Sequence, residues 1–171
     1  MTGSEGARLM TGAEAIVECL KIEGISTLFC VPGESYLPVL DALYQEQSID
    51  LISARHEGAA SFMAEGYAKA SGKPGVVMAT RGVGASNLAI GVHTAYQDST
   101  PMLVLLGQVH SYFRGREGFQ EIDLAQFLRR SQSGRLKFMK QDVCQSLSKG
   151  RCELHKQADL VRWSFRFLRM C

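Results

Sequence analysis

Hydrophobic residues between positions 11 and 109 follow two spacings that take turns along the chain. Apolar positions three or four residues apart predict helices over 11–24, 36–44, 57–70 and 85–96. Short runs that are apolar at nearly every position predict strands over 27–31, 50–54, 75–80 and 101–109. Such runs are typical of strands covered on both faces. The alternation therefore predicts a three-layer α/β/α fold with a parallel sheet in the middle.

Individual residues predict where the helices begin and which side they bury. Thr11 is a favourable N-cap, and Glu14 three residues later completes a capping box. Pro38 suits the first turn of the second helix, where a missing backbone N–H costs nothing. In the third helix, Met63 and Tyr67 share a face with alanines, so we expect both side chains in the core.

Composition narrows the class of protein. The chain has 171 residues, 46% hydrophobic and 21% charged, which is typical of one globular domain and excludes disordered, collagen-like and coiled-coil classes. No apolar run approaches the roughly 20 residues of a membrane span, and the first residues lack a secretory signal. We therefore expect a cytoplasmic protein that does not bind membranes. Five scattered cysteines without a Cys-x-x-Cys pair predict free thiols and no metal centre.

The net charge of +2 conceals a division near residue 128. Residues 1–127 hold eight Lys and Arg against fourteen Asp and Glu, a net charge of −6. Residues 128–171 hold eleven basic and three acidic residues, a net charge of +8. A change this abrupt indicates two segments of different origin or different role.

Candidate functional residues follow the predicted strands, because open α/β sheets bind ligands at the carboxyl ends of their strands. Glu57 stands between the second strand and the third helix, followed by Gly58 and two alanines. A carboxylate there can be presented to a ligand that approaches closely. The position by itself favours a simpler interpretation, in which Glu57 complements the helix dipole.

Two other patterns are weaker by themselves. Gly82-Val83-Gly84 opens the fourth helix, but Asn87 stands where a dinucleotide fingerprint has its third glycine, so a tight packing turn is favoured. His56, His93 and His110 lack metal-ligand spacing and are expected to be surface or capping residues.

In combination, these segments resemble one family. The segments are Val31-Pro32-Gly33-Glu34, Arg55-His56-Glu57-Gly58, Thr80-Arg81-Gly82-Val83-Gly84-Ala85-Ser86-Asn87, Gly107-Gln108-Val109 and Gly118-Phe119-Gln120-Glu121-Ile122-Asp123. Their order and spacing resemble the N-terminal, pyrimidine-binding domain of thiamine-diphosphate-dependent enzymes of the acetolactate synthase type. The resemblance covers about residues 9–127 and implies the thiamine-diphosphate-binding fold.

The resemblance gives Glu57 a catalytic role. In this family the matching Glu hydrogen-bonds a ring nitrogen of the cofactor's aminopyrimidine and favours the imino tautomer, which removes the thiazolium C2 proton to give the ylide. The resemblance implies further cofactor-binding residues, namely Pro32, Gly33, Gly82, Gly84 and Asn87. It places Gln108, Phe119 and Gln120 on the substrate side. Many relatives have Ser-Gly-Pro where this chain has Arg81-Gly82-Val83.

The resemblance also implies what residues 9–127 lack. Family members hold the diphosphate through Mg²⁺ with a Gly-Asp-Gly…Asn motif in a further domain, supplied to each site by a second subunit, and Gly-Asp-Gly does not occur here. We therefore expect a truncated domain of a 2-oxo acid decarboxylase or carboligase, inactive alone and binding only the pyrimidine half of the cofactor. Its partner would be another copy in a homo-oligomer or a separate diphosphate-domain subunit, as in a split two-chain enzyme.

Both ends of the chain are expected to differ from the domain. We expect residues 1–8 to be disordered and the basic tail, 128–171, to be poorly ordered. In a frame built from the last base of one codon and the first two of the next, residues 158–171 can encode Gly-Pro-Gly-Pro-Val-Val-Leu-Ser-Phe-Pro-Glu-Asp-Val. That peptide resembles the family's sequence after this domain, so we interpret the tail as a frameshift product.

A competing interpretation gives the tail a function. Val161, Trp163, Phe165 and Phe167 alternate with polar and basic residues, a strand-like pattern with a cationic face. The chain would then be a non-catalytic α/β module whose basic arm binds nucleic acid or an anionic membrane. No regular basic helix or RNA-binding signature supports this, and we expect no nucleic-acid partner.

Overall fold

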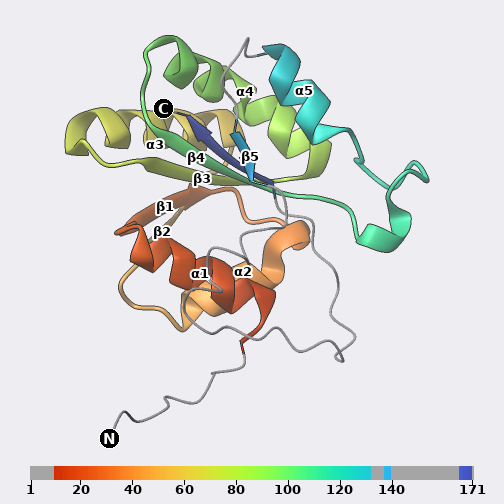
Figure 1. Ribbon diagram of the computed structural model, residues 1–171, viewed down its shortest axis with the longest axis horizontal. Coiled ribbons are helices and arrows are strands. Elements are labelled where there is room, and N and C mark those ends of the chain that lie inside the picture. The colour runs from red at the N-terminus through yellow and green to blue at the C-terminus, as the bar shows by residue number, and fades with distance from the viewer. Residues whose placement is uncertain (1–9, 132–136, 140–165, 171) are drawn as a thin grey trace, which may run out of the picture.

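The computed structural model describes residues 10–131, 137–139 and 166–170, which form one sheet between helices (Figure 1). The sheet order is β2-β1-β3-β4-β6-β5. Four strands run parallel, namely β1 (Thr27–Cys30), β2 (Asp50–Ser53), β3 (Gly75–Thr80) and β4 (Met102–Gly107). The parallel sheet predicted from the apolar runs is confirmed for these strands.

Helices cover both faces of the sheet, as predicted. Helices α1 (Gly12–Ile22) and α2 (Leu37–Tyr44) lie on one face, and α3 (Glu57–Ser71), α4 (Arg81–Gln97) and α5 (Leu124–Ser131) lie on the other (Figure 1). Short 3-10 turns occupy η1 (Glu34–Tyr36) and η2 (Ser111–Phe113). The three-layer α/β/α prediction is therefore confirmed, although β2 is a sheet edge whose Leu51 and Ile52 are both 37% exposed.

The predicted helix starts are confirmed on the α1 and α2 side. The Thr11 hydroxyl accepts from Glu14 N, and the Glu14 carboxylate accepts from Thr11 N at 2.6 Å, which completes the capping box. Pro38 occupies the first turn of α2. Both helices thus begin where local hydrogen-bonding rules place them.

Each face of the sheet has its own apolar core. The α1 and α2 side buries large side chains: Ile16, Val17, Leu20, Leu28, Tyr36, Val39, Leu43 and Met78 among them. The α3, α4 and α5 side buries many small ones: Ala60, Ala64, Ala79, Ala85 and Ala95, together with Val77, Leu88, Val92, Val104 and Leu106.

Two expectations about α3 and α4 need correction. Met63 is 39% exposed, so its predicted place in the core is wrong, whereas Tyr67 is partly buried against the core. The buried stripe of α3 instead includes Ser61 and Glu65, two polar residues that the apolar pattern could not mark. Helix α4 starts at Arg81 rather than at Ala85, so the two glycines of Gly82-Val83-Gly84 lie in its first turn.

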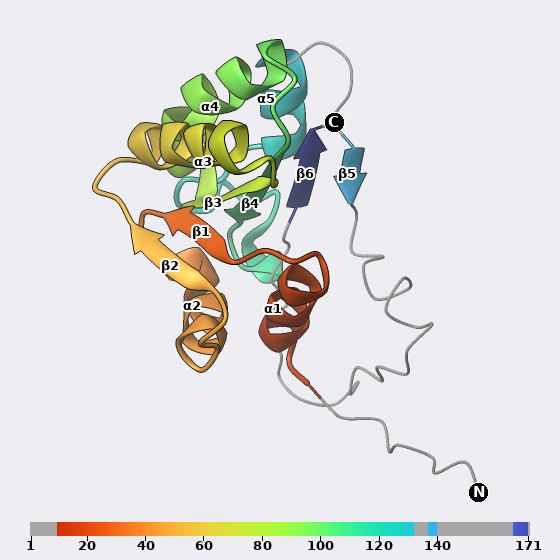
Figure 2. The ribbon, with the colours of Figure 1, turned by 90° about the vertical axis from the view of Figure 1, so that its left-hand side faces the viewer.

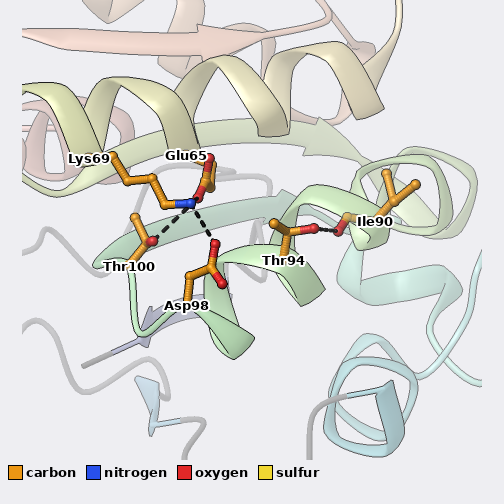
Figure 3. Close-up of polar contacts among 6 residues, drawn as sticks. All are labelled: Glu65, Lys69, Ile90, Thr94, Asp98 and Thr100. Carbon is orange, nitrogen blue, oxygen red and sulfur yellow. Dashed lines mark hydrogen bonds and ion pairs between the residues drawn. The ribbon is translucent and has the colours of Figure 1, made fainter.

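A polar cluster secures the far ends of α3 and α4 (Figure 3). Lys69 Nζ contacts Glu65 Oε1 and Asp98 Oδ2, each at 2.5 Å. Thr100 Oγ1 also donates to Glu65 Oε1 at 3.4 Å. The buried Glu65 carboxylate is thereby paired with a cation, which a buried charge requires.

The tail contributes two strands to the described structure. Strand β6 (Arg166–Met170) pairs antiparallel with β4, and β5 (Lys137–Met139) pairs antiparallel with β6 (Figure 2). Residues 137–139 and 166–170 are thus described as sheet. Residues 128–131 of the expected tail are the end of α5, where Leu128 is fully buried. The expected disorder of residues 1–8, 132–136, 140–165 and 171 concerns positions outside the described ones. No helix among the described residues is long and apolar enough to span a bilayer.

Candidate functional site

The loops after β1, β3 and β4 meet at one edge of the sheet. Gly33 packs against Thr80, since a Cβ at Gly33 would lie 2.7 Å from Thr80 Cβ. The Ser35 and Thr80 hydroxyls are hydrogen-bonded to each other. Gly82 N donates to Gln120 O at 2.9 Å. The carboxyl ends of the parallel strands thus gather most of the predicted site residues at one place, as the open-sheet rule requires.

Glu57 is the first residue of α3 and is half-buried at this edge. Asn87 Nδ2, from α4, donates to Glu57 Oε2 at 2.9 Å. The carboxylate therefore lies at a helix N-terminus, where the backbone presents partial positive charge. His56 is the N-cap of α3, and its Nδ1 accepts from Gly58 N at 3.0 Å. The capping role expected for this histidine is confirmed.

The other oxygen of Glu57 faces a glycine. A Cβ at Gly84 would lie 3.4 Å from Glu57 Oε1 and 3.1 Å from Ala79 Cβ. Among the described residues no donor is recorded for Oε1, whereas Oε2 has Asn87. Gly84 therefore lets the first turn of α4 approach the sheet and keeps larger side chains away from Oε1.

Tyr36 holds the turn after β1 from the buried side. This side chain is fully buried, and its hydroxyl donates to Val31 O. Burial raises the pKa of Tyr36 well above its usual range, with further contributions from Cys30 and Glu57, so the phenol stays neutral. Pro32 is exposed and Gly33 half-buried on the turn that Tyr36 supports.

The three residues expected on the substrate side differ in their surroundings. Gln108 is buried, and both ends of its amide are used within the chain: Nε2 donates to Ile122 O and Oε1 accepts from Val109 N, each at 2.8 Å. Phe119 is 75% exposed. Gln120 has a φ of +63°, and its carbonyl oxygen accepts a hydrogen bond from Gly82 N. Gln108 thus fastens the loop that carries Phe119 and Gln120.

A hollow of about 580 Å³ lies beside the same loop. It is lined by Gln108, Arg114, Gly115, Glu117, Glu121, Ile122, Asp123 and Leu124. Glu121 accepts from Gly115 N and Gly118 N, and these bonds lower its pKa. Within the described part of the chain, no group of three His, Cys, Asp or Glu side chains is arranged to hold a metal ion.

Arg81, for which the sequence predicted no role, contacts two loops at this edge. Its guanidinium pairs with Glu34 at 2.5 Å, and Nη1 lies 3.5 Å from Phe119 O. The available signal was the departure from the Ser that many relatives carry at this position. Sequence alone does not reveal that the residue joins two loops.

Comparison with known proteins identifies the family of this chain. Residues 10–127 match the model of the thiamine pyrophosphate enzyme, N-terminal TPP binding domain. The chain is 47% identical over 114 residues to a probable acetolactate synthase large subunit of Methanocaldococcus jannaschii, covering 67% of this chain and 19% of that protein. It is 50% identical over 114 residues to a counterpart of Methanococcus aeolicus, with the same coverage.

A bacterial relative gives the same result. The acetolactate synthase isozyme 2 large subunit of Escherichia coli is 44% identical over 115 residues, covering 67% of this chain and 21% of that protein. The chain thus matches about a fifth of the length of these curated relatives. With the family model covering residues 10–127, the chain belongs to the thiamine pyrophosphate enzyme family through its N-terminal TPP binding domain.

Proposed function

We propose that residues 10–127 form the pyrimidine-binding half of a thiamine diphosphate site in a protein of the acetolactate synthase type. In this proposal, Glu57 hydrogen-bonds a ring nitrogen of the cofactor's aminopyrimidine. The observation that carries it is the unequal use of the carboxylate: Asn87 holds Oε2, while Oε1 lies beside Gly84. A carboxylate oriented through one oxygen can offer the other to a planar ligand.

The surroundings of Glu57 fit that role. A half-buried carboxylate forms a stronger hydrogen bond to a heteroaromatic nitrogen than one surrounded by water. The Asn87 amide holds Oε2 at the start of α3, so Oε1 can hydrogen-bond the ring nitrogen. When bound, thiamine diphosphate supplies the carbanion chemistry of 2-oxo acid conversion.

The other site residues have proposed places around Glu57. Gly84 and Asn87 border the carboxylate, while Gly82, in the same turn of α4, approaches Gln120. Pro32 and Gly33 form the turn that would meet the pyrimidine edge. Gln108, Phe119 and Gln120 lie on the proposed substrate side, where Gln108 acts by holding the loop and Phe119 offers an exposed ring.

The outer face of α3 and α4 supports a second subunit in the complete site. Four large apolar side chains are exposed there: Phe62, Met63, Val83 and Ile90. An apolar surface beside a functional site is typical of an interface. We propose that a second subunit, another copy or a separate chain, covers this face and supplies the Mg²⁺ and diphosphate contacts. Residues 10–127 alone would then bind the cofactor weakly and would not turn over a 2-oxo acid.

Cofactor titration of the full chain tests the role of Glu57. Thiamine diphosphate with Mg²⁺ is added while amide and Asn side-chain signals are followed by NMR. We expect shifts at Gly84 and Asn87, and a dissociation constant about tenfold or more larger for Glu57→Gln, because a charged hydrogen bond contributes roughly 1.5–3 kcal/mol. Glu23→Gln, an exposed glutamate at the end of α1, is the matched control. Equal affinity of the two variants would contradict the proposal.

A further inference from the structure

Arg81 occupies an unusual backbone position between β3 and α4. Its φ is +48°, in the left-handed region that favours glycine. A non-glycine residue held there costs free energy and persists only where its surroundings require it. The side chain is only 17% exposed. The contacts of that side chain are therefore the natural reason for the strained backbone.

The guanidinium of Arg81 joins two segments that are far apart in sequence. On one side it pairs with Glu34 Oε1 at 2.5 Å, in the turn after β1. On the other side, Nη1 is 3.5 Å from Phe119 O, and the Phe119 ring centroid is 5.9 Å from Cζ. The planar fork of arginine can engage a carboxylate and a carbonyl at once, which a lysine ammonium cannot do with the same geometry.

The neighbouring residue strengthens the same connection. Gly82 N donates to Gln120 O at 2.9 Å, and a Cβ at Gly82 would lie 2.9 Å from that oxygen. Two consecutive residues of α4 thus hold two consecutive residues of the loop after β4. Gln120 itself has a φ of +63°, so both partners adopt constrained backbones where they meet.

The geometry points to Arg81 as a positioning residue that latches the Phe119-Gln120 segment to the Pro32-Gly33-Glu34 turn. The latch fixes the separation between the loop expected to face the substrate and the turn expected to face the pyrimidine. Naming those loops rests on the proposed function, whereas the latch itself rests on the contacts of Arg81. Arg81 acts through the loops and touches no reacting atom.

Hydrogen exchange of the full chain, read by mass spectrometry, tests the latch. Arg81→Gln is expected to raise exchange about tenfold or more in peptides from 108–123 and to leave α1 unchanged. Arg81→Lys, which keeps the charge, should give an intermediate rate, and Glu34→Gln should raise exchange in the same peptides. Arg55 is an exposed arginine after β2, so Arg55→Gln is the control and should change exchange neither in 108–123 nor in α1. Unchanged exchange in 108–123, or an equal rise in every peptide, would overturn the latch.

Cofactor titration separates this inference from the proposed function. Thiamine diphosphate should slow exchange at 118–121 in the unmodified chain. Arg81→Gln should abolish that slowing while the cofactor still shifts the Asn87 side chain. If the slowing survives in Arg81→Gln, Arg81 does not position the loop. If 108–123 opens in Arg81→Gln but Glu57→Gln binds cofactor as the unmodified chain does, the latch stands and the role of Glu57 fails.

Discussion

On one face of the sheet, α1 and α2 bury large side chains such as Leu20, Tyr36 and Val39, whereas on the other face α3 and α4 meet through small ones. A Cβ at Gly91 of α4 would overlap Ser61 of α3. The first face is a core in which large apolar side chains fill the space between the helices and the sheet. The second face also buries large side chains such as Leu88, Met102 and Leu106, but α3 and α4 approach each other closely at small residues. The candidate site lies at the end of that contact.

The difference follows from what each face has to do. Asn87 reaches Glu57 at 2.9 Å because α3 and α4 lie close together, and that closeness depends on small residues along their contact. Leu88 and Val92 of α4 are buried, but other large apolar residues of these helices, Phe62 and Ile90 among them, are exposed. Close packing therefore aligns the carboxylate, and the exposed apolar side chains form the surface that we propose a second subunit covers.

The largest effect is expected on the α1 and α2 side. Leu20→Ala removes a side chain that is only 2% exposed, and the cavity should lower the free energy of unfolding by about 2–5 kcal/mol. Ile22→Ala, in the same helix but at 72% exposure, should change it little. Urea unfolding followed by circular dichroism measures both. If the two variants lost equal stability, the α1 and α2 side would not be the packed core described above.

The α3 and α4 side should lose stability when a side chain is enlarged rather than shortened. Gly91→Ala adds a methyl group against Ser61 and should cost about 1–3 kcal/mol, as overpacking does. It should also shift the Asn87 side-chain signal in NMR spectra, because the helices must separate. Gly66→Ala is the matched control: nothing lies within 4 Å of its Cβ, so it should stabilise the helix by about 0.5–1 kcal/mol. A neutral Gly91→Ala would show that the helices can move apart freely.

The same contrast explains what could be predicted from sequence. On the α1 and α2 side, apolar spacing and capping signals are local, so Thr11, Glu14 and Pro38 mark the helix starts correctly. The strands were also predictable, because buried parallel strands are apolar at nearly every position. The predicted bounds 75–80 match β3, whereas those of the other three strands extend a residue or two too far, as in 101–109 against Met102–Gly107.

On the α3 and α4 side, the same rules gave wrong predictions for the start of α4 and for the burial of Met63, for physical reasons. Gly82 and Gly84 resemble a turn in sequence, but they lie in the first turn of α4. They are glycines because the sheet and the loop after β4 leave little room for a Cβ there. Met63 is apolar, as core residues are, but it is exposed, because the buried stripe of α3 consists of small and polar residues. Glu57 could be located from its place after a strand, but its cofactor role came only from the family resemblance.

A smaller effect is expected from the cap of α1. Thr11→Ala removes the hydroxyl that accepts from Glu14 N and should lower stability by about 1 kcal/mol. Thr94→Ala, inside α4, is the control from the other layer. There the hydroxyl only donates back to Ile90 O (Figure 3), so its removal should be neutral or slightly stabilising. Thermal unfolding compares the two, and equal losses would contradict the local capping argument.

The smallest effect concerns a partly exposed ion pair between Lys21 of α1 and Glu46, just after α2. Glu46 Oε2 lies 2.7 Å from Lys21 Nζ, and Glu46 Oε1 accepts from Ser48 N. These contacts, Lys21 first, lower the pKa of Glu46 to about 2 from its ordinary 4.5. Because the folded-state pKa is the lower one, the pair stabilises the fold fully above about pH 4.5 and progressively less as the pH falls towards 2.

Glu46→Gln should therefore lower the unfolding midpoint slightly at pH 7, and the difference should fade as the pH falls through about 2. The difference at pH 7 should also shrink in 1 M salt, because exposed charges are screened. Asp41→Asn, an exposed acid in α2, is the control for loss of a charge without a recorded partner among the described residues. Equal pH profiles for the two variants would show that Lys21 does not recognise Glu46 in particular. Such a result would leave apolar packing alone to hold α1 against α2 and would widen the contrast between the two faces.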